Sequence, residues 1–320
     1  MKKIITIFAF TIIGLTVMAQ GKPSAKIFSN FNYNISDNDN AYKAFEIKRA
    51  YLGYGYSLSD AFSTQVTFDI GKNSSGSDYT AFLKIASVSW KASDKMNVNF
   101  GMIGTKNFKF MEKTWGHRYI YKSLQDQHKW ANSADAGVSV DYKVNGKFTL
   151  DAQILNGEGY KKLQESNGLF RGSAGITYTV SEKLALRLNR DVVPRENYGT
   201  NDAHQNTTSA AMAYSGEGFK LGLEYNLQEN ANNVINQERT GISAYGNYAL
   251  NNGMSIFGRY DELSSENQWN ISKDGNFIIL GVEKEMVKGL KIALNYQSWT
   301  SEIEGTDSKD FVYMNFEYKF

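Results

Sequence analysis

The sequence lacks cysteine altogether and has only two prolines and three histidines in 320 residues. Without cysteine the chain can form no disulfide and can carry no cysteine-linked lipid. The few histidines leave little material for a zinc site or a histidine-activated nucleophile. Beyond residue 20 no apolar run is long enough for a membrane-spanning helix. We therefore expect no catalytic residue, cofactor or metal, and we expect stability to come from burial and backbone pairing.

The one long apolar run lies between Ile4 and Met18, directly after two lysines, and Val17 and Ala19 suit cleavage after Ala19. We predict a signal peptide at 1–19 and a mature chain at 20–320. The alternative is an N-terminal membrane anchor, for which the run is shorter than the roughly 18 to 20 residues that a helix needs to span. Two of the 35 basic residues and none of the 33 acidic ones lie in this segment, so the mature chain is neutral. Its net charge indicates no nucleic-acid partner.

The rest of the chain alternates apolar and polar residues with the two-residue period of a β-strand. In FSTQVTFDI (62–70) the even-numbered residues face one way and the odd-numbered residues, including Asp69, face the other. Further stretches with this pattern are 138–143, 148–154, 219–228 and 290–297. Each segment has an apolar face that lipid or another part of the protein must cover.

Connections between these segments alternate between long and short. The long ones are polar and lie around 36–41, 71–79, 104–132, 156–168, 191–206, 229–238, 264–274 and 300–309. The short ones are rich in turn-forming residues and lie at 59–61, 93–95, 145–146, 181–183, 216–218, 251–253 and 287–289. This order predicts about sixteen antiparallel strands with both chain ends on the short-turn side, the layout of a bacterial outer-membrane barrel. The count could differ by two, because 207–215 and 253–263 alternate weakly.

Aromatic residues favour such a barrel over the alternative, a soluble exported β-sandwich with a core of Val, Ile and Leu. The chain has 20 Tyr and 19 Phe, and rings of this kind suit the two membrane–water boundaries. Several tyrosines lie near predicted strand ends: Tyr51, Tyr54, Tyr56, Tyr142, Tyr178, Tyr225, Tyr248 and Tyr296. We therefore predict an all-β transmembrane antiparallel barrel with short periplasmic turns and long extracellular loops, located in the outer membrane of a Gram-negative cell and in contact with its lipid.

The C-terminal sequence FVYMNFEYKF (311–320) places aromatic and apolar residues at alternate positions up to Phe320. The chain thus ends inside a strand, which must pair with the first strand to close the cylinder. A terminal strand that ends in Phe resembles the assembly signal of outer-membrane proteins, so the barrel-assembly machinery is an expected partner. In the alternative fold it would be an edge strand, where exposed aromatic residues invite aggregation.

Two stretches, FEIKRAYLGYGYSLSDAFSTQVTFDIG (45–71) and LKIASVSWKASDKMNVNFGMIG (83–104), resemble the phosphate-selective porin O/P family and its porin relatives. The shared features are the pair Arg49-Ala50 opening a strand, a turn into a Phe-Asp strand, and a Trp strand leading to a glycine-bearing one. The resemblance implies a homotrimeric porin of sixteen strands, whose third outside loop folds inward and narrows the pore. The third long connection, 104–132, is the longest and fits that role.

The resemblance also implies an inward ladder of arginines, for which the candidates are Arg49, Arg171, Arg187 and Arg259. The sequence departs from the family here, because acidic residues share the same faces by parity: Asp69, Asp135, Asp141, Asp151, Glu224 and Asp261.

The connection 104–132 is strongly basic for a segment of a neutral chain. Its basic residues, Lys106, Lys109, Lys113, Arg118, Lys122 and Lys129, outnumber its acidic residues, Glu112 and Asp126. In a narrow pore such an excess would concentrate anions, and we hypothesise that Lys113, His117 and Arg118 point into the channel. In the alternative arrangement the aromatic residues of this loop pack on the wall and its lysines face solvent.

These features together predict a porin that lets small hydrophilic solutes or anions diffuse passively, with a phosphate-like anion preference. A barrel of this strand number holds a water-filled channel, so function is expected in the pore lining. The alternatives are an outer-membrane barrel with an enzymatic role and one with a structural or adhesive role. No serine is marked as a nucleophile by its sequence context. The sequence GYG at 53–55 lies within a predicted strand, so it does not indicate a phosphate-binding loop or a dinucleotide-binding motif.

Overall fold

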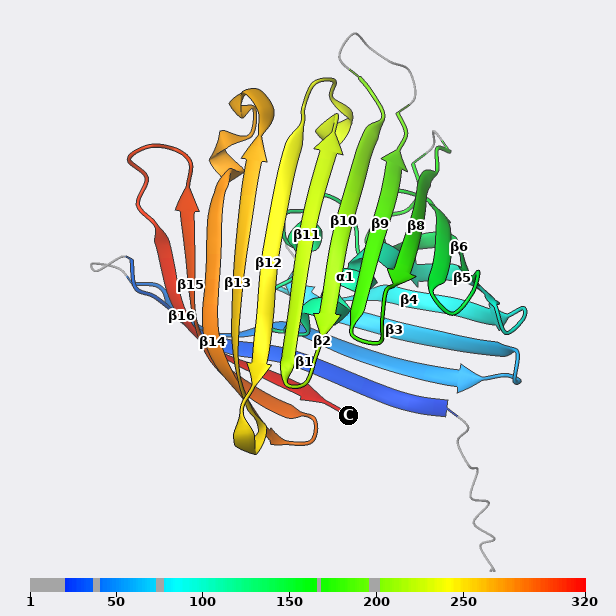
Figure 1. Cartoon of the computed structure of the whole chain (residues 1–320), viewed down its shortest axis with the longest axis horizontal. Helices are drawn as coiled ribbons and strands as arrows, with labels where there is room; N and C mark the ends of the chain where they lie inside the picture. Colours follow the sequence, from blue (N-terminus) through cyan, green and yellow to red (C-terminus); the bar gives the residue numbers. More distant parts are fainter. Residues whose placement is uncertain (1–20, 37–40, 73–77, 166–167, 196–201) are drawn as a thin grey trace, which may run out of the picture.

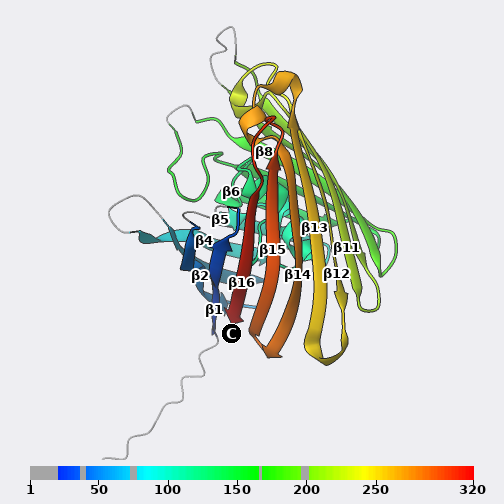
Figure 2. The same cartoon turned by 90° about the vertical axis from the view of Figure 1, so that its left-hand side faces the viewer.

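The computed structural model describes residues 21–36, 41–72, 78–165, 168–195 and 202–320. The predicted signal peptide lies outside these residues. The described chain forms a closed antiparallel barrel of sixteen strands, in which each strand pairs with its neighbours in sequence and β1 pairs with β16 (Figures 1 and 2). The predicted fold and strand number are confirmed, including the two weakly alternating segments.

The long first strands are β1 (Gly21–Asn34), β2 (Lys43–Ser57), β3 (Phe62–Lys72), β4 (Tyr79–Lys91) and β5 (Met96–Gly104). The middle strands are β6 (Ala134–Lys143), β7 (Phe148–Leu155), β8 (Arg171–Thr179), β9 (Leu184–Val193), β10 (Gln205–Ser215) and β11 (Phe219–Glu229). The last strands are β12 (Arg239–Ala249), β13 (Met254–Ser265), β14 (Gly275–Val287), β15 (Leu290–Ser301) and β16 (Lys309–Lys319). Short 3-10 turns, η1 (Ala231–Asn233), η2 (Asn251–Gly253), η3 (Glu266–Gln268) and η4 (Ile271–Lys273), lie in the connections.

Side-chain hydrogen bonds shape the short turns. The Ser59 hydroxyl accepts the backbone N–H of Phe62 at 3.1 Å, and the Asn145 side chain accepts the N–H of Phe148 at 2.9 Å. Such bonds tighten a connection between antiparallel strands. The start of β1 and the end of β16 lie at this short-turn end, and the backbone of Phe320 bonds that of Ala25 in both directions at 3.2 Å. The last strand therefore closes the cylinder, as its sequence predicts.

The alternation of side chains gives the barrel an apolar outside. In β11, Leu223 and Tyr225 are exposed on the outer surface, whereas the intervening Glu224 and Asn226 are buried inside. Burial of apolar rings and chains in lipid replaces the soluble core that these residues would otherwise need. The outer face is thus suited to a hydrocarbon environment.

Part of the interior is filled by protein. Two helices, α1 (Lys106–Trp115) and α2 (Leu124–Gln127), lie in the connection between β5 and β6. Figure 1 shows α1 behind β10 and β11. We call this connection, residues 105–133, the inserted segment. Trp115, Tyr119 and Ile120 pack with inward rings from the strands, including Tyr245 and Phe257, into a buried apolar cluster. The expectation of a water-filled interior is therefore wrong for the part of the barrel that this cluster occupies.

One tyrosine assigned to a membrane boundary lies elsewhere. Tyr51 faces the interior, where its ring contacts that of Phe28 edge-on at 5.7 Å. A β-bulge earlier in β2 shifts the alternation and turns Tyr51 inward.

Two features are absent from the described residues. No helix there is long and apolar enough to cross a membrane. The same part of the chain contains no group of three His, Cys, Asp or Glu residues that could hold a metal ion.

Candidate functional site

Helix α1 presents an apolar face to the barrel wall. Phe108, Met111 and Trp115, spaced three and four residues apart, are buried. The helix ends at Gly116, whose φ of 74° is left-handed and is adopted by glycine without strain. The chain then reverses direction inside the barrel and continues toward α2.

Hydrogen bonds fix the inserted segment to strands β10 and β11. Asn107 donates to the Ser209 hydroxyl on β10 at 3.3 Å. The Gln125 amide donates to the same hydroxyl and to the side-chain oxygen of Asn226 on β11, both at 2.7 Å. All four side chains are buried, and each such bond satisfies polar groups that would be costly to leave unpaired.

Two of the predicted inward arginines lie beneath this segment. Arg187 donates to Asp151 from Nη1 at 2.6 Å and from Nη2 at 2.9 Å. Arg259 donates to Asp261 from Nε and Nη2, each at 2.8 Å, and from Nη1 to the Lys122 carbonyl at 2.8 Å. Both guanidiniums face inward, but their acidic partners neutralise them and the segment covers them. They anchor the inserted segment and do not line the open cavities described below.

His117 does not reach open space either. It is 2% exposed and packs on the Phe257 ring at a centroid distance of 4.6 Å. Its Nδ1 lies 3.0 Å from the Trp115 carbonyl and its Nε2 lies 3.5 Å from Glu283, to which Tyr119 donates at 2.7 Å. Burial lowers the pKa of His117, so the ring is neutral at pH 7. The hypothesis that His117 points into the channel is corrected by its packing against the wall.

Two β-bulges, one in β2 and one in β4, bring additional basic side chains into the barrel interior. The register of β2 against β1 skips Lys48, and that of β4 against β3 skips Lys84. A bulge leaves two successive side chains on one face, here Lys48 with Arg49 and Lys84 with Ile85, all of which line interior cavities. The two bulges flank β3, where Asp69 is fully buried.

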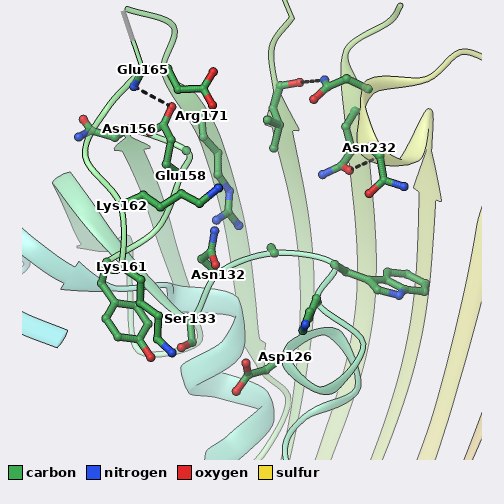
Figure 3. A pocket seen from close by; sticks show the side chains of 18 of the residues that line it. Asp126, Asn132, Ser133, Asn156, Glu158, Lys161, Lys162, Glu165, Arg171 and Asn232 are labelled. Atoms are coloured by element: carbon green, nitrogen blue, oxygen red, sulfur yellow. Dashed lines mark hydrogen bonds between the residues drawn. The ribbon is translucent and has the colours of Figure 1, made fainter. Parts of the chain in front are cut away.

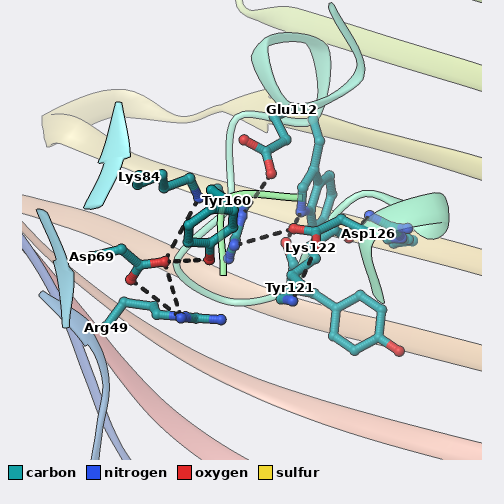
Figure 4. Close-up of polar contacts among 11 residues, drawn as sticks. Arg49, Asp69, Lys84, Glu112, Tyr121, Lys122, Asp126 and Tyr160 are labelled. Atoms are coloured by element: carbon teal, nitrogen blue, oxygen red, sulfur yellow. Dashed lines mark hydrogen bonds and ion pairs between the residues drawn. The ribbon is translucent and has the colours of Figure 1, made fainter. Parts of the chain in front are cut away.

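Asp69 gathers three side chains around it. Arg49 donates to it at 3.0 Å, the Lys84 ammonium lies at 3.9 Å, and the hydroxyl of Tyr160 donates at 2.8 Å (Figure 4). Tyr160 comes from the connection between β7 and β8, so this second connection also enters the barrel. Burial and the neighbouring Asp69 carboxylate raise the pKa of Tyr160, which keeps its hydroxyl protonated as a donor.

A second charged group lies on the inserted segment and faces the first. Arg118 donates to Glu112 at 2.7 Å and to Asp126 at 3.3 Å, and Lys122 donates to Asp126 at 3.2 Å. Burial alone would raise the pKa of Asp126, but Lys122 and Arg118 hold it below its usual value. The two groups together form what we call the mid-barrel cluster: Arg49, Asp69, Lys84, Glu112, Arg118, Lys122, Asp126 and Tyr160 (Figure 4).

Open cavities meet at this cluster from both ends of the barrel. A cavity of about 720 Å³ lies on the long-loop side, and others of about 730 and 900 Å³ lie on the short-turn side. Lys84 and Arg118 line all three. These two side chains therefore lie where the three cavities adjoin.

The cavity linings are strongly basic. On the long-loop side nine Lys or Arg residues line the cavity against three Asp or Glu residues, and in the smaller short-turn cavity eight do so against three. Figure 3 shows Lys161, Lys162 and Arg171 around the long-loop cavity with the acids Glu158 and Glu165. Arg171, a predicted candidate, also binds Asp191 at 2.8 Å.

Three of the other predicted lysines lie on the short-turn side. Lys106, Lys109 and Lys113 all line the cavity of about 730 Å³. Lys109 and Lys113 are exposed to this cavity on the face of α1 opposite its buried apolar face, whereas Lys106 forms an ion pair with Asp141. Lys122 lines the long-loop side.

Sequence reasoning missed Lys84, Tyr160 and Lys161 at this site. For Lys84 a signal was present: the outward apolar residues of β4 fall on odd numbers up to Leu83 and on even numbers from Val88, and this change of phase marks a bulge. For Tyr160 and Lys161 the sequence offered no signal, because nothing local tells an inward connection from an outward one.

Comparison with known proteins gives a family match. A sequence model of the OmpL-like beta-barrel porin-2 family matches residues 128–303, more than half of the chain. A search of the curated proteins finds no match.

Solved structures share the fold. OprB of Pseudomonas putida matches with a TM-score of 0.74 and 10% identity over 95% of each chain. An anion-selective porin from Comamonas acidovorans matches at 0.70 and 11% identity, over 94% of this chain and 99% of that one. A trimer form of OmpT, an outer membrane protein of Vibrio cholerae, matches at 0.62 and 15% identity, over 94% and 99%. At these identities the likeness shows the fold alone.

The resemblance read from the sequence is confirmed at the level of porins, while the matching family model is not that of the phosphate-selective O/P porins. The closed barrel with its basic interior cavities and the family match agree. The chain belongs to the OmpL-like beta-barrel porin-2 family and is a porin-like channel of the outer membrane.

Proposed function

We propose that the protein lets small hydrophilic solutes diffuse passively across the outer membrane and prefers anions. The observation that carries this proposal is the basic lining on both sides of the mid-barrel cluster, within a chain whose net charge is only +2. Basic side chains in a narrow, low-dielectric passage raise the local concentration of anions and repel cations.

The connection 104–132 would act as the constriction, with Lys84 and Arg118 at its narrowest part. Fixed geometry supports this role, because Glu112 and Asp126 hold the Arg118 guanidinium in place while it still lines cavities on both sides. Lys106, Lys109 and Lys113 would extend the basic lining toward the short turns.

A broad anion preference fits better than a phosphate-specific ladder. Arg171, Arg187 and Arg259 are each paired with an aspartate, so their charge is largely cancelled. The anion-selective Comamonas porin, which shares the fold, supports the sign of the preference. Phosphate would then be one permeant anion among several.

Assembly belongs to the same proposal. By analogy with the trimer form of OmpT we propose a homotrimer, exported through cleavage of residues 1–19, inserted by the barrel-assembly machinery through the strand ending at Phe320, and surrounded by outer-membrane lipid.

Reversal potentials in planar bilayers test the preference. With a potassium chloride gradient, the wild-type protein should pass chloride better than potassium. Arg118→Gln should lower the chloride-to-potassium permeability ratio about two- to fivefold, because Glu112 and Asp126 would then face the passage with one cation fewer. Lys91→Gln serves as a control, since Lys91 is exposed and pairs with Asp94 in a short turn. A potassium preference in the wild type would refute the proposal, and absence of any conductance would favour the structural or adhesive role.

A further inference from the structure

A separate cavity of about 320 Å³ lies beside the mid-barrel cluster, between residues 118–122 and the strands β1, β2, β3, β15 and β16. Arg49, Arg118 and Lys122 line both this cavity and the long-loop cavity. It is therefore a side pocket of the proposed route, and its size lies at the small end of cavities that hold small molecules.

The lining of this side pocket is one-sided in charge. Five basic residues line it, no acidic residue of the described chain does so, and Gln127 and Gln297 add uncharged polar groups. Three of the five, Arg49, Arg118 and Lys122, are ion-paired with carboxylates outside the lining, so the charge available to a ligand comes mainly from Lys48 and Lys72. At its mouth Lys48 and Lys72 share the single carboxylate of Glu46, at 2.9 and 2.7 Å, which leaves one positive charge in excess. Both lysine side chains are about half exposed, at 45% and 59%, so either can exchange its contact with Glu46 for one with an anion.

The deep end of the side pocket is apolar. Phe28, Tyr119 and Ile120 are at most 8% exposed and form its floor. Phe28 packs against the Tyr119 ring at 6.3 Å, and Phe28 also lines the short-turn cavity, so this ring separates the two spaces. A basic mouth above an aromatic floor matches a ligand with an anionic end and an apolar ring.

We propose that this side pocket binds small aromatic carboxylates of the size of benzoate. The carboxylate lies between Lys48, Lys72 and Arg49, and the ring lies on Phe28 and Ile120. The proposal rests on the proposed function only in that the ligand enters by the outer mouth of an anion-preferring channel. A bound molecule beside Arg118 obstructs the route, so binding is seen as a saturable block of the ion current.

Benzoate, acetate and benzyl alcohol are the probes, because acetate lacks the ring and benzyl alcohol lacks the charge. Benzoate should block the current at a concentration at least about tenfold lower than either of the others, since both the ring and the charge contribute. Equal block by acetate and benzoate would overturn the proposal, because the aromatic floor would then contribute nothing.

Variants locate the site. Lys48→Gln with Lys72→Gln should raise the half-blocking benzoate concentration about three- to tenfold. The matched pair Lys109→Gln with Lys113→Gln removes the same charge from the short-turn cavity, so it should reduce the anion preference and leave the benzoate concentration within about twofold. Equal effects of the two pairs would also overturn the proposal.

Calorimetric titration of benzoate into the detergent-solubilised protein measures the pocket without conduction. Binding that weakens in the Lys48 and Lys72 double variant supports the site even if no current is found, in which case only the channel proposal fails. A normal anion-preferring current without benzoate binding has the opposite meaning and refutes the side pocket alone.

Discussion

At the scale of single residues, the inserted segment depends on histidines that stay neutral. His128 is half-buried near the Trp299 ring, and within the described chain its Nε2 has no hydrogen-bond partner. Burial lowers the pKa of His128 to about 4, an effect that the nearby Asp261 only partly offsets. A proton on this ring is therefore bound more weakly in the folded state than in the unfolded state.

Acidic pH should loosen the fold through His128. An unfolded histidine titrates at about 6.5. Between that pH and about 4 the unfolded state therefore binds more protons than the folded state, and the free energy of unfolding decreases as the pH is lowered. Above this window His128 contributes no pH dependence. The drop in the thermal unfolding midpoint from pH 7.5 to pH 4.5, measured in detergent, should be smaller in His128→Gln than in the wild type. His204→Gln, at an exposed position, is the control, and an equal drop in all three proteins would contradict this account.

At the scale of elements, strand β13 holds the inserted segment through a buried ion pair. Arg259 and Asp261 are both fully buried, and the same guanidinium donates to the Lys122 carbonyl. A buried charge that loses its partner is costly, whereas replacing both charges with apolar groups is often tolerated.

Asp261→Ala should therefore lower the free energy of unfolding by about 3–5 kcal/mol, because it leaves the Arg259 charge buried without its carboxylate. The double variant Arg259→Met with Asp261→Leu should lose much less. Urea unfolding in lipid vesicles measures both values. If the double variant is as unstable as the single one, the hydrogen bond to Lys122, and not charge compensation, holds the segment.

Strands were predictable from sequence because their signals are local. Alternation around Phe62 to Ile70 and turn residues such as Asn145 each report on a few neighbouring positions. The interior was less predictable, since Arg187 finds Asp151 across β8 and a single extra residue at Lys48 or Lys84 reverses a face. The basic composition of 104–132 set this segment apart from the other connections. Which of its side chains meet water could not be read from it, because that depends on the far wall.

At the scale of the whole molecule, the barrel interior is divided into two parts. Under β10 to β14 the inserted segment packs tightly, with Leu124 fully buried, whereas toward β2 to β6 basic cavities meet at Arg118. We expect ions to cross only on this second side, along the exposed lysines of α1.

The absence of cysteine from the chain allows the most direct test of this expectation. Lys109→Cys and Leu124→Cys are placed separately in bilayers and treated with a sulfonate-bearing methanethiosulfonate reagent while current is recorded. Lys109→Cys should react rapidly, with a fall in current and in chloride preference, because the reagent adds a negative charge at a position of the passage that the substitution has made neutral. Leu124→Cys should stay unmodified. Rapid reaction at Leu124→Cys, or modification of Lys109→Cys that leaves the current unchanged, would contradict the account.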